Sequence, residues 1–420
     1  MKTALKTKAA RPGVSLRDDR LNALLDAAAA EFNLYGVAGA SLSRITEKVG
    51  LTRAALYYYV DSREDLAFRC YRRACRVMAD DLAAAQKGAR AGLERVRRFI
   101  LATLDPARPA GVVLTDMACL DDARRAEVEA LHGRNAALLR KFIEDGIRDG
   151  SVRDCDAEVA AQAILGMVFW APLAGEWTPG VGEDVRRHAA HSIAELVSDG
   201  VAADPDAPVE CPVEVASLAF RPGNAFDREA AAAIKVELLT RAASGLFNKR
   251  GIDGTSLDDV TQELGATKGA FYQYFPDKGT LVVECHKRAQ RLFVAIAEAA
   301  ERLGRSGKER GLIGLHLLTQ AYASDLAPLA PLTGLEALPA RARAPILRRA
   351  ADLQQRYERF SSDGIKDGSY RPFEVRTLST TGAGVFAWIP RWRSEDDPRP
   401  ARALADEMVA LFARGLRSRP

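Results

Sequence analysis

LLDAAAAEFNLYGVAGASLSRITEKVGLTRAALYYYVDSREDL, residues 24–66, is the stretch that decides the fold, because the chain contains it twice. LTRAASGLFNKRGIDGTSLDDVTQELGATKGAFYQYFPDKGTL, residues 239–281, aligns with it without a gap, and sixteen of the 43 paired positions are identical. Self-similarity at a fixed separation identifies a structural unit. The spacing from Leu24 to its counterpart Leu239 is far longer than a solenoid repeat, and it predicts a duplicated domain.

The repeat extends beyond these stretches. DGIRDGSVR (145–153) matches DGIKDGSYR (363–371), and LVSDGV (196–201) resembles LFARGL (411–416). Gly166 and Trp170 recur as Gly384 and Trp388. We therefore predict two copies of one unit that together cover nearly the whole chain. Ala, Leu, Arg and Glu are abundant and few windows alternate with period two, so each copy is expected to be all-α.

Within each copy the pattern predicts three short helices. In the first copy Gly36 ends the first helix, and Ser41 caps a second over residues 42–49. After a turn at Gly50, Thr52 caps the third. The second copy repeats these signals with Gly251, Gly265 and Thr267, and Ser256 with Asp259 forms a predicted capping box. Two helices joined by a short turn that contains glycine are typical of a helix-turn-helix, whose second helix enters the major groove of DNA.

The side chains of the third helix suit DNA. A cation opens it, small residues follow that allow close approach to the groove, and tyrosines and a further cation are placed to hold phosphates. In the first copy the predicted DNA-binding residues are Ser41, Ser43, Arg44, Thr52, Arg53, Ala54, Tyr57, Tyr58, Tyr59 and Arg63. In the second copy they are Ser256, Thr267, Lys268, Gly269, Tyr272, Gln273, Tyr274 and Lys278.

Both segments resemble the DNA-binding domain of the TetR/AcrR family of bacterial transcriptional regulators. The first copy supplies the family's pattern with Phe32, Gly36, Ser41, Ile45, Gly50, Thr52, Arg53, Leu56, Tyr57, Tyr59, Arg63 and Leu66. The second supplies Phe247, Gly251, Ser256, Val260, Gly265, Thr267, Lys268, Phe271, Tyr272, Tyr274, Phe275, Lys278 and Leu281. The chain departs from the pattern at Thr46, Thr261 and Val60. Asp258 and Asp259 lie near the expected DNA backbone, and their charge is expected to weaken DNA binding by the second copy.

The resemblance implies a helical ligand-binding bundle after each DNA-binding domain, with the last two helices of each unit used for dimerisation. Candidate dimerisation helices are residues 157–170 with 184–198, and residues 374–388 with 400–414. Trp170 and Trp388 could line a ligand pocket, although packing in the core or interface is the favoured role. The resemblance implies homodimers of single units, whereas this chain carries two units, which could pair within one chain or between two chains.

These observations predict six segments in an all-α protein of two tandem TetR-like halves. They are a basic disordered arm (1–19), a first DNA-binding domain (20–66), a first ligand and dimerisation domain (67–200), a linker (201–228), a second DNA-binding domain (229–281) and a second ligand and dimerisation domain (282–420). Four prolines in the linker predict a partly extended tether. Such a tether leaves the second copy free to dock in several orientations.

Charge and composition narrow the function further. The net charge is +4, but residues 1–64 carry ten Lys or Arg against seven Asp or Glu, whereas residues 228–280 carry seven of each. The six cysteines show no metal-ligand or CxxC spacing, which favours small buried hydrophobes in a reducing compartment. No cofactor motif, secretory signal or bilayer-length apolar stretch is found, so we expect a cytoplasmic protein without a cofactor or membrane partner.

The leading hypothesis is a repressor that an unknown small-molecule effector releases from a pseudo-palindromic operator in double-stranded DNA. The halves could pair within one chain as a pseudo-dimer, or two chains could associate. A protein-interaction adaptor, with one or both helix-turn-helix domains no longer binding DNA, is the alternative. An enzyme is not expected, because no nucleophile elbow, metal triad, P-loop or GxGxxG motif occurs.

Overall fold

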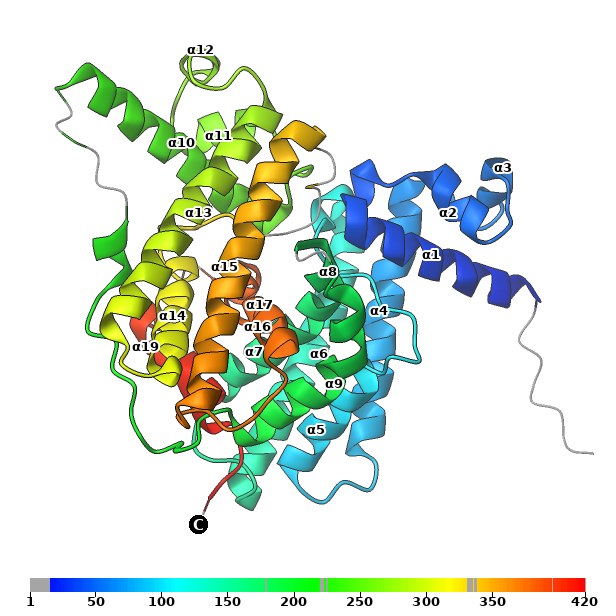
Figure 1. The fold of residues 1–420 in the computed structure, drawn as a ribbon. Coiled ribbons are helices and arrows are strands. Elements are labelled where there is room, and N and C mark those ends of the chain that lie inside the picture. Colours follow the sequence, from blue (N-terminus) through cyan, green and yellow to red (C-terminus); the bar gives the residue numbers. More distant parts are fainter. Residues whose placement is uncertain are drawn as a thin grey trace, which may run out of the picture.

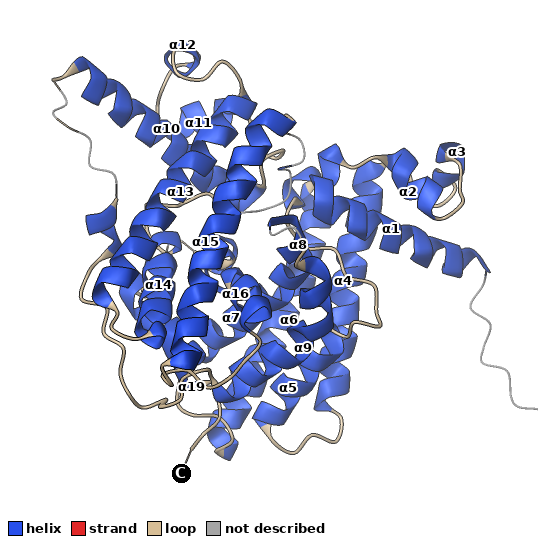
Figure 2. Ribbon diagram, viewed as in Figure 1, coloured by secondary structure: helices blue, strands red, loops and turns tan. Residues whose placement is uncertain are grey.

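The computed structural model describes residues 16–177, 180–219, 223, 226–330, 335, 338–394 and 396–419. Within these ranges the chain consists of α-helices and short 3-10 helices, with two isolated β-bridges and no strand (Figure 2). The prediction of an all-α protein with two related halves is confirmed.

The first half begins with the three helices of its helix-turn-helix domain: α1 (Leu16–Gly39), α2 (Leu42–Lys48) and α3 (Arg53–Leu56). The helical body follows, with α4 (Arg63–Gln86), α5 (Gly92–Thr103), η1 (Met117–Cys119), α6 (Asp122–Asp149), α7 (Ala157–Trp170), η2 (Ala171–Leu173), α8 (Ala174–Trp177) and α9 (Gly182–Asp199). The first domain already includes Leu16, ahead of the predicted boundary at residue 20. The rest of the predicted arm, residues 1–15, lies outside the described residues.

The second half repeats this order after η3 (Val215–Leu218). Its helix-turn-helix domain contains α10 (Arg228–Arg250), α11 (Leu257–Glu263) and α12 (Lys268–Tyr272). Its body contains α13 (Lys278–Leu303), α14 (Gly307–Tyr322), α15 (Ala340–Lys366), α16 (Val375–Thr381), α17 (Ala383–Ala387), α18 (Ile389–Trp392) and α19 (Ala401–Arg414). The two halves lie side by side, and both helix-turn-helix domains lie in the upper part of the view, on opposite sides (Figure 1).

The halves pack together through the helices that the family resemblance assigns to dimerisation. α7 of the first half contacts α17 and α19 of the second, while α9 contacts α16 and α19. The four predicted helices therefore meet within one chain. In the second half, the predicted helix over residues 374–388 is divided at Gly382 into α16 and α17, which corrects the expectation of one continuous helix.

α7 and α17 cross at Gly166 and Gly384, which occupy equivalent positions in the repeat. A Cβ atom built on either glycine would overlap the carbonyl oxygen of the other. Because only glycine lacks a Cβ, only glycine allows the two backbones to touch here. The recurrence of this glycine in both copies therefore reflects the packing of one half on the other.

Backbone hydrogen bonds across the interface occur in pairs related by the repeat. The Val201 N–H donates to Phe412 O (2.8 Å), and the equivalent Leu416 N–H donates to Val197 O (2.7 Å). The segments LVSDGV and LFARGL are thus hydrogen-bonded to each other in a two-fold symmetric arrangement. An interface in which each patch meets its own counterpart is the isologous contact of a two-fold dimer.

The repeated DGSVR and DGSYR segments supply a second symmetric pair. Arg153 Nε donates to the carbonyl oxygen of Gly415 (2.8 Å), and Arg371 Nε donates to that of Gly200 (2.6 Å). Each arginine therefore closes the end of a helix in the opposite half. This contact explains why the DGSVR and DGSYR segments both keep the arginine, which the sequence showed only as a similarity.

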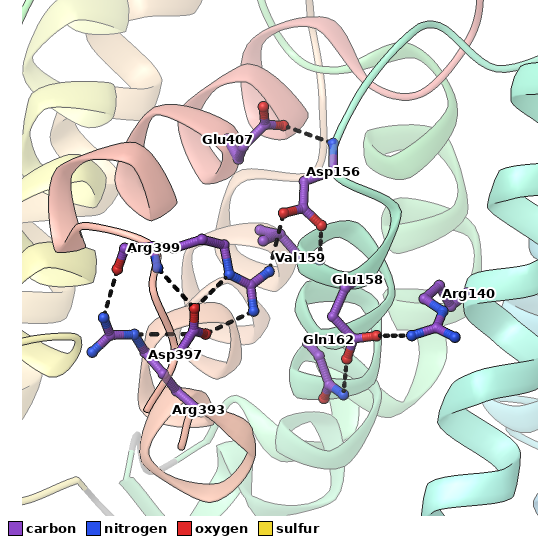
Figure 3. Close-up of polar contacts among 9 residues, drawn as sticks. All are labelled: Arg140, Asp156, Glu158, Val159, Gln162, Arg393, Asp397, Arg399 and Glu407. Atoms are coloured by element: carbon purple, nitrogen blue, oxygen red, sulfur yellow. Dashed lines mark hydrogen bonds and ion pairs between the residues drawn. The ribbon is translucent and has the colours of Figure 1, made fainter. Parts of the chain in front are cut away.

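A polar cluster breaks this symmetry at the start of α7 (Figure 3). One carboxylate oxygen of Asp156 accepts the Val159 N–H and caps the helix (3.0 Å), while the other accepts Arg399 Nη1 (3.0 Å). Arg399 also donates to Asp397, and these hydrogen bonds lower the pKa of Asp397 to about 2. Glu374, at the equivalent position of the second half, makes no side-chain cap. The Asp156–Arg399 pair therefore has no exact equivalent on the other side of the interface, where Arg376 of the second half pairs with Asp184 of the first (3.6 Å).

The predicted linker is not a free tether in its described part. Cys211 and Val215 are buried in a cluster with α13 and α14, and Ala202 forms a bridge with Tyr370. The expectation that the second copy could dock in several orientations is therefore wrong, because the linker's apolar side chains are held in the second half's core. Residues 220–222 and 224–225 of the linker lie outside the described ranges.

None of the described helices combines the length and apolarity needed to cross a bilayer. All six cysteines are free thiols, and Cys70, Cys75, Cys211 and Cys285 are buried. Burial raises the pKa of the Cys70 and Cys285 thiols to about 12, so both remain protonated and serve as small core residues.

Candidate nucleic-acid interface

Both recognition helices begin at the capping residues that the sequence predicts. Thr52 Oγ1 accepts the Ala55 N–H at the start of α3, and Thr267 Oγ1 accepts the Ala270 N–H at the start of α12, both at 3.2 Å. Ser41 caps α2, and the capping box at the start of α11 is present. These local hydrogen bonds satisfy amide groups that a short helix leaves unpaired.

One side of each recognition helix is anchored and the other faces solvent. Leu56 and Phe271 are 1% exposed and fix the helices to their domains. The exposed predicted residues are Arg44, Thr52, Arg53, Ala54, Tyr57 and Tyr58 in the first domain, and Ser256, Thr267, Lys268, Gly269, Tyr272 and Gln273 in the second. The half-buried ones are Ser41, Ser43, Tyr59, Arg63, Tyr274 and Lys278. The exposed face carries the cation, the small residue and tyrosine in both copies.

The leading cations of the two recognition helices have different surroundings. Lys268 Nζ lies 2.8 Å from a carboxylate oxygen of Asp258 on α11, and this hydrogen bond raises the pKa of Lys268. The residue equivalent to Asp258 in the first copy is Ser43, and no carboxylate of the described residues pairs with Arg53. Arg53 is therefore available to a phosphate or base edge, whereas Lys268 must first exchange its carboxylate partner.

Glu31 organises the first domain and was missed by sequence reasoning. Its side chain is 1% exposed; it forms an ion pair with Arg44 and accepts the Ser41 N–H at 3.0 Å. Arg44 also lies over the ring of Tyr35 at 4.4 Å. A glutamate beside Ala28 and Phe32 on the apolar face of the first helix was the available signal. Its partner could not be found from the sequence, because α1 and α2 meet only in the fold.

Two predicted phosphate-binding residues have structural neighbours. Arg63 donates to the backbone oxygens of Val37 (3.1 Å) and Ala38 and so holds the end of α1. Lys278 is half-buried, and its desolvation lowers its pKa. Their contact with DNA remains a prediction.

Trp170 and Trp388 lie where α7 and α17 cross. They are 6% and 7% exposed, and the ring of Trp388 packs 4.8 Å from that of Phe169. Trp170 also borders a cavity of about 140 Å³ in the second half. The structure thus places both residues between the halves, and a ligand-binding role for them remains a prediction.

The first half contains a cavity of about 550 Å³ that α1 partly lines. Its walls come from α1, α4, the segment after α5, α7 and α9, all of the first half. Apolar side chains such as Val77, Met78 and Phe169 line it together with two ion pairs, Arg73–Asp26 and Arg108–Asp81. Such mixed lining is common in sites for small organic molecules.

The corresponding space in the second half is divided. It holds two cavities of about 140 Å³ each, and Leu318, Tyr357 and Phe386 border both. The repeat replaces Val168 by Phe386 and Thr103 by Leu318, so larger side chains occupy the space. The stacked rings of Tyr322 and Phe386 have centroids 5.5 Å apart.

Two exposed recognition helices, each presented by a short scaffold on a helical body, define a DNA-binding protein of the helix-turn-helix class. A family model described as bacterial regulatory proteins, tetR family, matches residues 24–70 and 239–285. A second, described as tetracyclin repressor-like, C-terminal domain, matches residues 93–201 and 304–416. The chain belongs to the TetR family of bacterial regulators, with two family units in tandem. Such proteins are DNA-binding transcriptional regulators and not enzymes.

Known proteins resemble one unit at a time. The uncharacterized HTH-type transcriptional regulator Rv0196 of Mycobacterium tuberculosis is 30% identical over 174 residues, which is 37% of this chain and 84% of that protein. The HTH-type transcriptional regulator BetI of Rhizobium meliloti is 30% identical over 160 residues, 37% of this chain and 78% of BetI. The crystal structure of the TetR-family regulator PfmR from Thermus thermophilus is 23% identical, with a TM-score of 0.38, and covers 43% of this chain and 98% of its own.

Proposed function

We propose that the protein is a single-chain pseudo-dimeric transcriptional regulator of the cytoplasm, in which two helix-turn-helix domains bind one operator. One observation carries this proposal: the dimerisation helices of the two halves already pack on each other within one chain. Because each isologous patch is occupied by its counterpart, a second chain is not needed to complete the pair.

The operator would have two related but unequal half-sites. Arg53 and Ala54 of the first recognition helix correspond to Lys268 and Gly269 of the second, and these residues occupy positions that contact base edges in helix-turn-helix proteins. An arginine can bond guanine with two hydrogen bonds, whereas lysine presents a point charge. The free Arg53 supports a larger contribution from the first domain, and the pairing of Lys268 with Asp258 supports a smaller one from the second.

We infer that one effector molecule binds per chain, in the cavity of the first half. The volume of about 550 Å³ suits a small organic molecule, and the charged pairs at the apolar walls suit an amphipathic one. The cavity wall is bonded to the DNA-binding domain, because the Asn33 side chain of α1 donates to Gly111 O (3.0 Å) and accepts the Val113 N–H (2.9 Å). An occupant that displaces this wall moves α1 and releases the operator, as in a repressor.

Light scattering with and without a short duplex from the DNA upstream of the gene tests the assembly. We expect a species of 45.5 kDa that binds as one chain per duplex. A 2:2 complex with paired chains would contradict the pseudo-dimer.

A gel shift on the same duplex at two salt concentrations tests the function itself. Binding should weaken steeply as salt rises, because displaced counterions return to the phosphates. The absence of salt-dependent binding would instead favour the alternative, a protein-interaction adaptor.

A further inference from the structure

Asp116 lies between the two helix-turn-helix domains. It follows the segment that closes the first cavity and precedes η1, and its side chain is 8% exposed. Its Oδ2 accepts the Val37 N–H at 2.9 Å, immediately after the end of the regular part of α1 at Gly36. Its Oδ1 faces the second domain: a Cβ built on Gly251 would lie 2.8 Å from it. One carboxylate therefore touches both DNA-binding domains.

The two points that Asp116 touches are equivalent in the repeat. Gly36 corresponds to Gly251, both have positive φ (69° and 82°), and both end the first helix of their domain. A Cβ on Gly36 would likewise lie 2.9 Å from Asp116 Oδ2. A group close to the same atom of two symmetry-related residues lies near the two-fold axis that relates them. Asp116 therefore lies near the pseudo-two-fold axis that relates Gly36 to Gly251.

Asp253 of the second domain also approaches Gly36, with Oδ2 3.6 Å from a built Cβ, but only the first half has an aspartate at the position of Asp116. LTDMACL (114–120) corresponds to LTGLEAL (332–338), so the counterpart of Asp116 is a glycine in the sequence. In a dimer of identical units, two such aspartates would meet at the axis, and their like charges would repel each other in a buried place. A fused chain can keep one and lose the other.

The second half holds the segment that carries Asp116. Arg391 of α18 donates from Nη1 to Leu114 O (2.7 Å) and from Nη2 to Thr115 O (2.8 Å). Ala118 packs directly on Gly254 of the second domain. The segment is therefore fixed from both halves, and Asp116 has little freedom to follow either domain alone.

We propose that Asp116 is a positioning residue that sets the relative placement of the two DNA-binding domains. The hydrogen bond to Val37 and the contact with Gly251 fix the ends of α1 and α10 against one carboxylate, so both recognition helices keep a single separation. The proposal concerns geometry and holds whether or not DNA is the partner, although its consequence for operator binding rests on the proposed function.

The separation can be measured in the full chain without DNA or effector. Spin labels carried by a genetically encoded keto amino acid replace Tyr58 and Gln273, which are exposed, equivalent residues of the two domains. Double electron–electron resonance should give one narrow distance distribution for the parent and a broadened or shifted one for Asp116→Ala. Asp80→Asn is the control, because Asp80 is an exposed acidic residue near the C-terminal end of α4. This variant should leave the distance distribution unchanged.

Asp116→Asn covers the case in which Asp116→Ala does not fold. The amide keeps the shape and one acceptor oxygen but removes the charge, so a smaller broadening is expected. If a folded Asp116 variant gave the parent distribution, the proposal would be overturned.

The consequence for DNA is measured by fluorescence anisotropy on two duplexes. Asp116→Ala should weaken binding to the complete operator about tenfold or more, since a rigid pair gains effective concentration that a loose pair loses. Binding to a duplex with one half-site scrambled should not change. Equal losses on both duplexes would contradict a positioning role, whereas loss of distance order without any DNA binding by the parent would contradict only the proposed function.

Discussion

Lys268 Nζ and a carboxylate oxygen of Asp258 lie 2.8 Å apart, so the cation that opens the second recognition helix is already paired inside its own domain. Both side chains are about two-thirds exposed, and the pair is therefore a weak, exchangeable contact and not a fixed part of the core. In the proposed complex with DNA, a phosphate that approaches Lys268 would compete with Asp258.

Asp258→Ser, which installs the residue of the first copy, should strengthen operator binding. One additional available cation is expected to steepen the dependence of log K on log salt by up to about 0.9. Ser43→Asp is the matched reciprocal variant and should weaken binding through Arg53. Anisotropy titrations at several salt concentrations measure both effects, and unchanged slopes in both variants would disprove this account.

Gly166→Ala should destabilise the fold by several kcal/mol, about 3 or more, because the new Cβ overlaps a carbonyl oxygen of α17 and the helices must separate. Gly133→Ala is the control. Gly133 lies exposed in α6 with no neighbouring atom near an added Cβ, and alanine there should be neutral or stabilise by about 0.5 to 1 kcal/mol. Urea unfolding measures both free energies, and similar stabilities of the two variants would argue against a tight crossing.

Val168→Phe should remove the response to effectors without loss of DNA binding. It places in the first half the residue that partitions the second, Phe386, and so reduces the cavity of about 550 Å³. A thermal-shift screen of small molecules on both proteins provides the comparison. Compounds that stabilise the parent should not stabilise the variant. If all of these compounds also stabilised the variant, the effector site would have to lie outside this cavity.

The stability should fall between pH 6.5 and about 4, partly because of His286. Its side chain is 5% exposed, and burial lowers its pKa to about 4. The unfolded chain binds this proton near pH 6.5, and the folded chain binds it only near pH 4. The free energy of unfolding therefore decreases by about 1.4 kcal/mol for each unit by which the pH falls within that window. Above pH 6.5 this contribution to stability is complete.

His286→Tyr, which installs the equivalent Tyr71, is the test of this effect. Urea unfolding at pH 7.5 and pH 5 should show a smaller loss of stability in the variant than in the parent. The pKa of His132 is also lowered to about 4, so His132 still contributes to the loss of stability at low pH in the variant. An identical loss in both proteins would rule out His286 as a source.

Local signals in the sequence predicted the helix caps of both helix-turn-helix domains. Ser41, Thr52, Ser256 and Thr267 cap the expected helices because capping depends on residues three positions apart, which the sequence shows directly. Relations between distant segments were not available in this way. The Glu31–Arg44 pair and the buried linker depend on which surfaces meet.

By itself, the sequence determined that the protein has two helical units with a helix-turn-helix domain at the start of each, because periodicity, caps and turns are local properties that recur in both copies. Only the tertiary structure decided that the two units pair within one chain, that one cavity is open and its counterpart divided, and that Asp116 stands between equivalent glycines. These features depend on steric fit between side chains far apart in sequence. The difference between Val168 and Phe386, or between Asp116 and the glycine at its repeat position, does not change the hydrophobic periodicity or the caps. It does change which atoms fill one place in the fold.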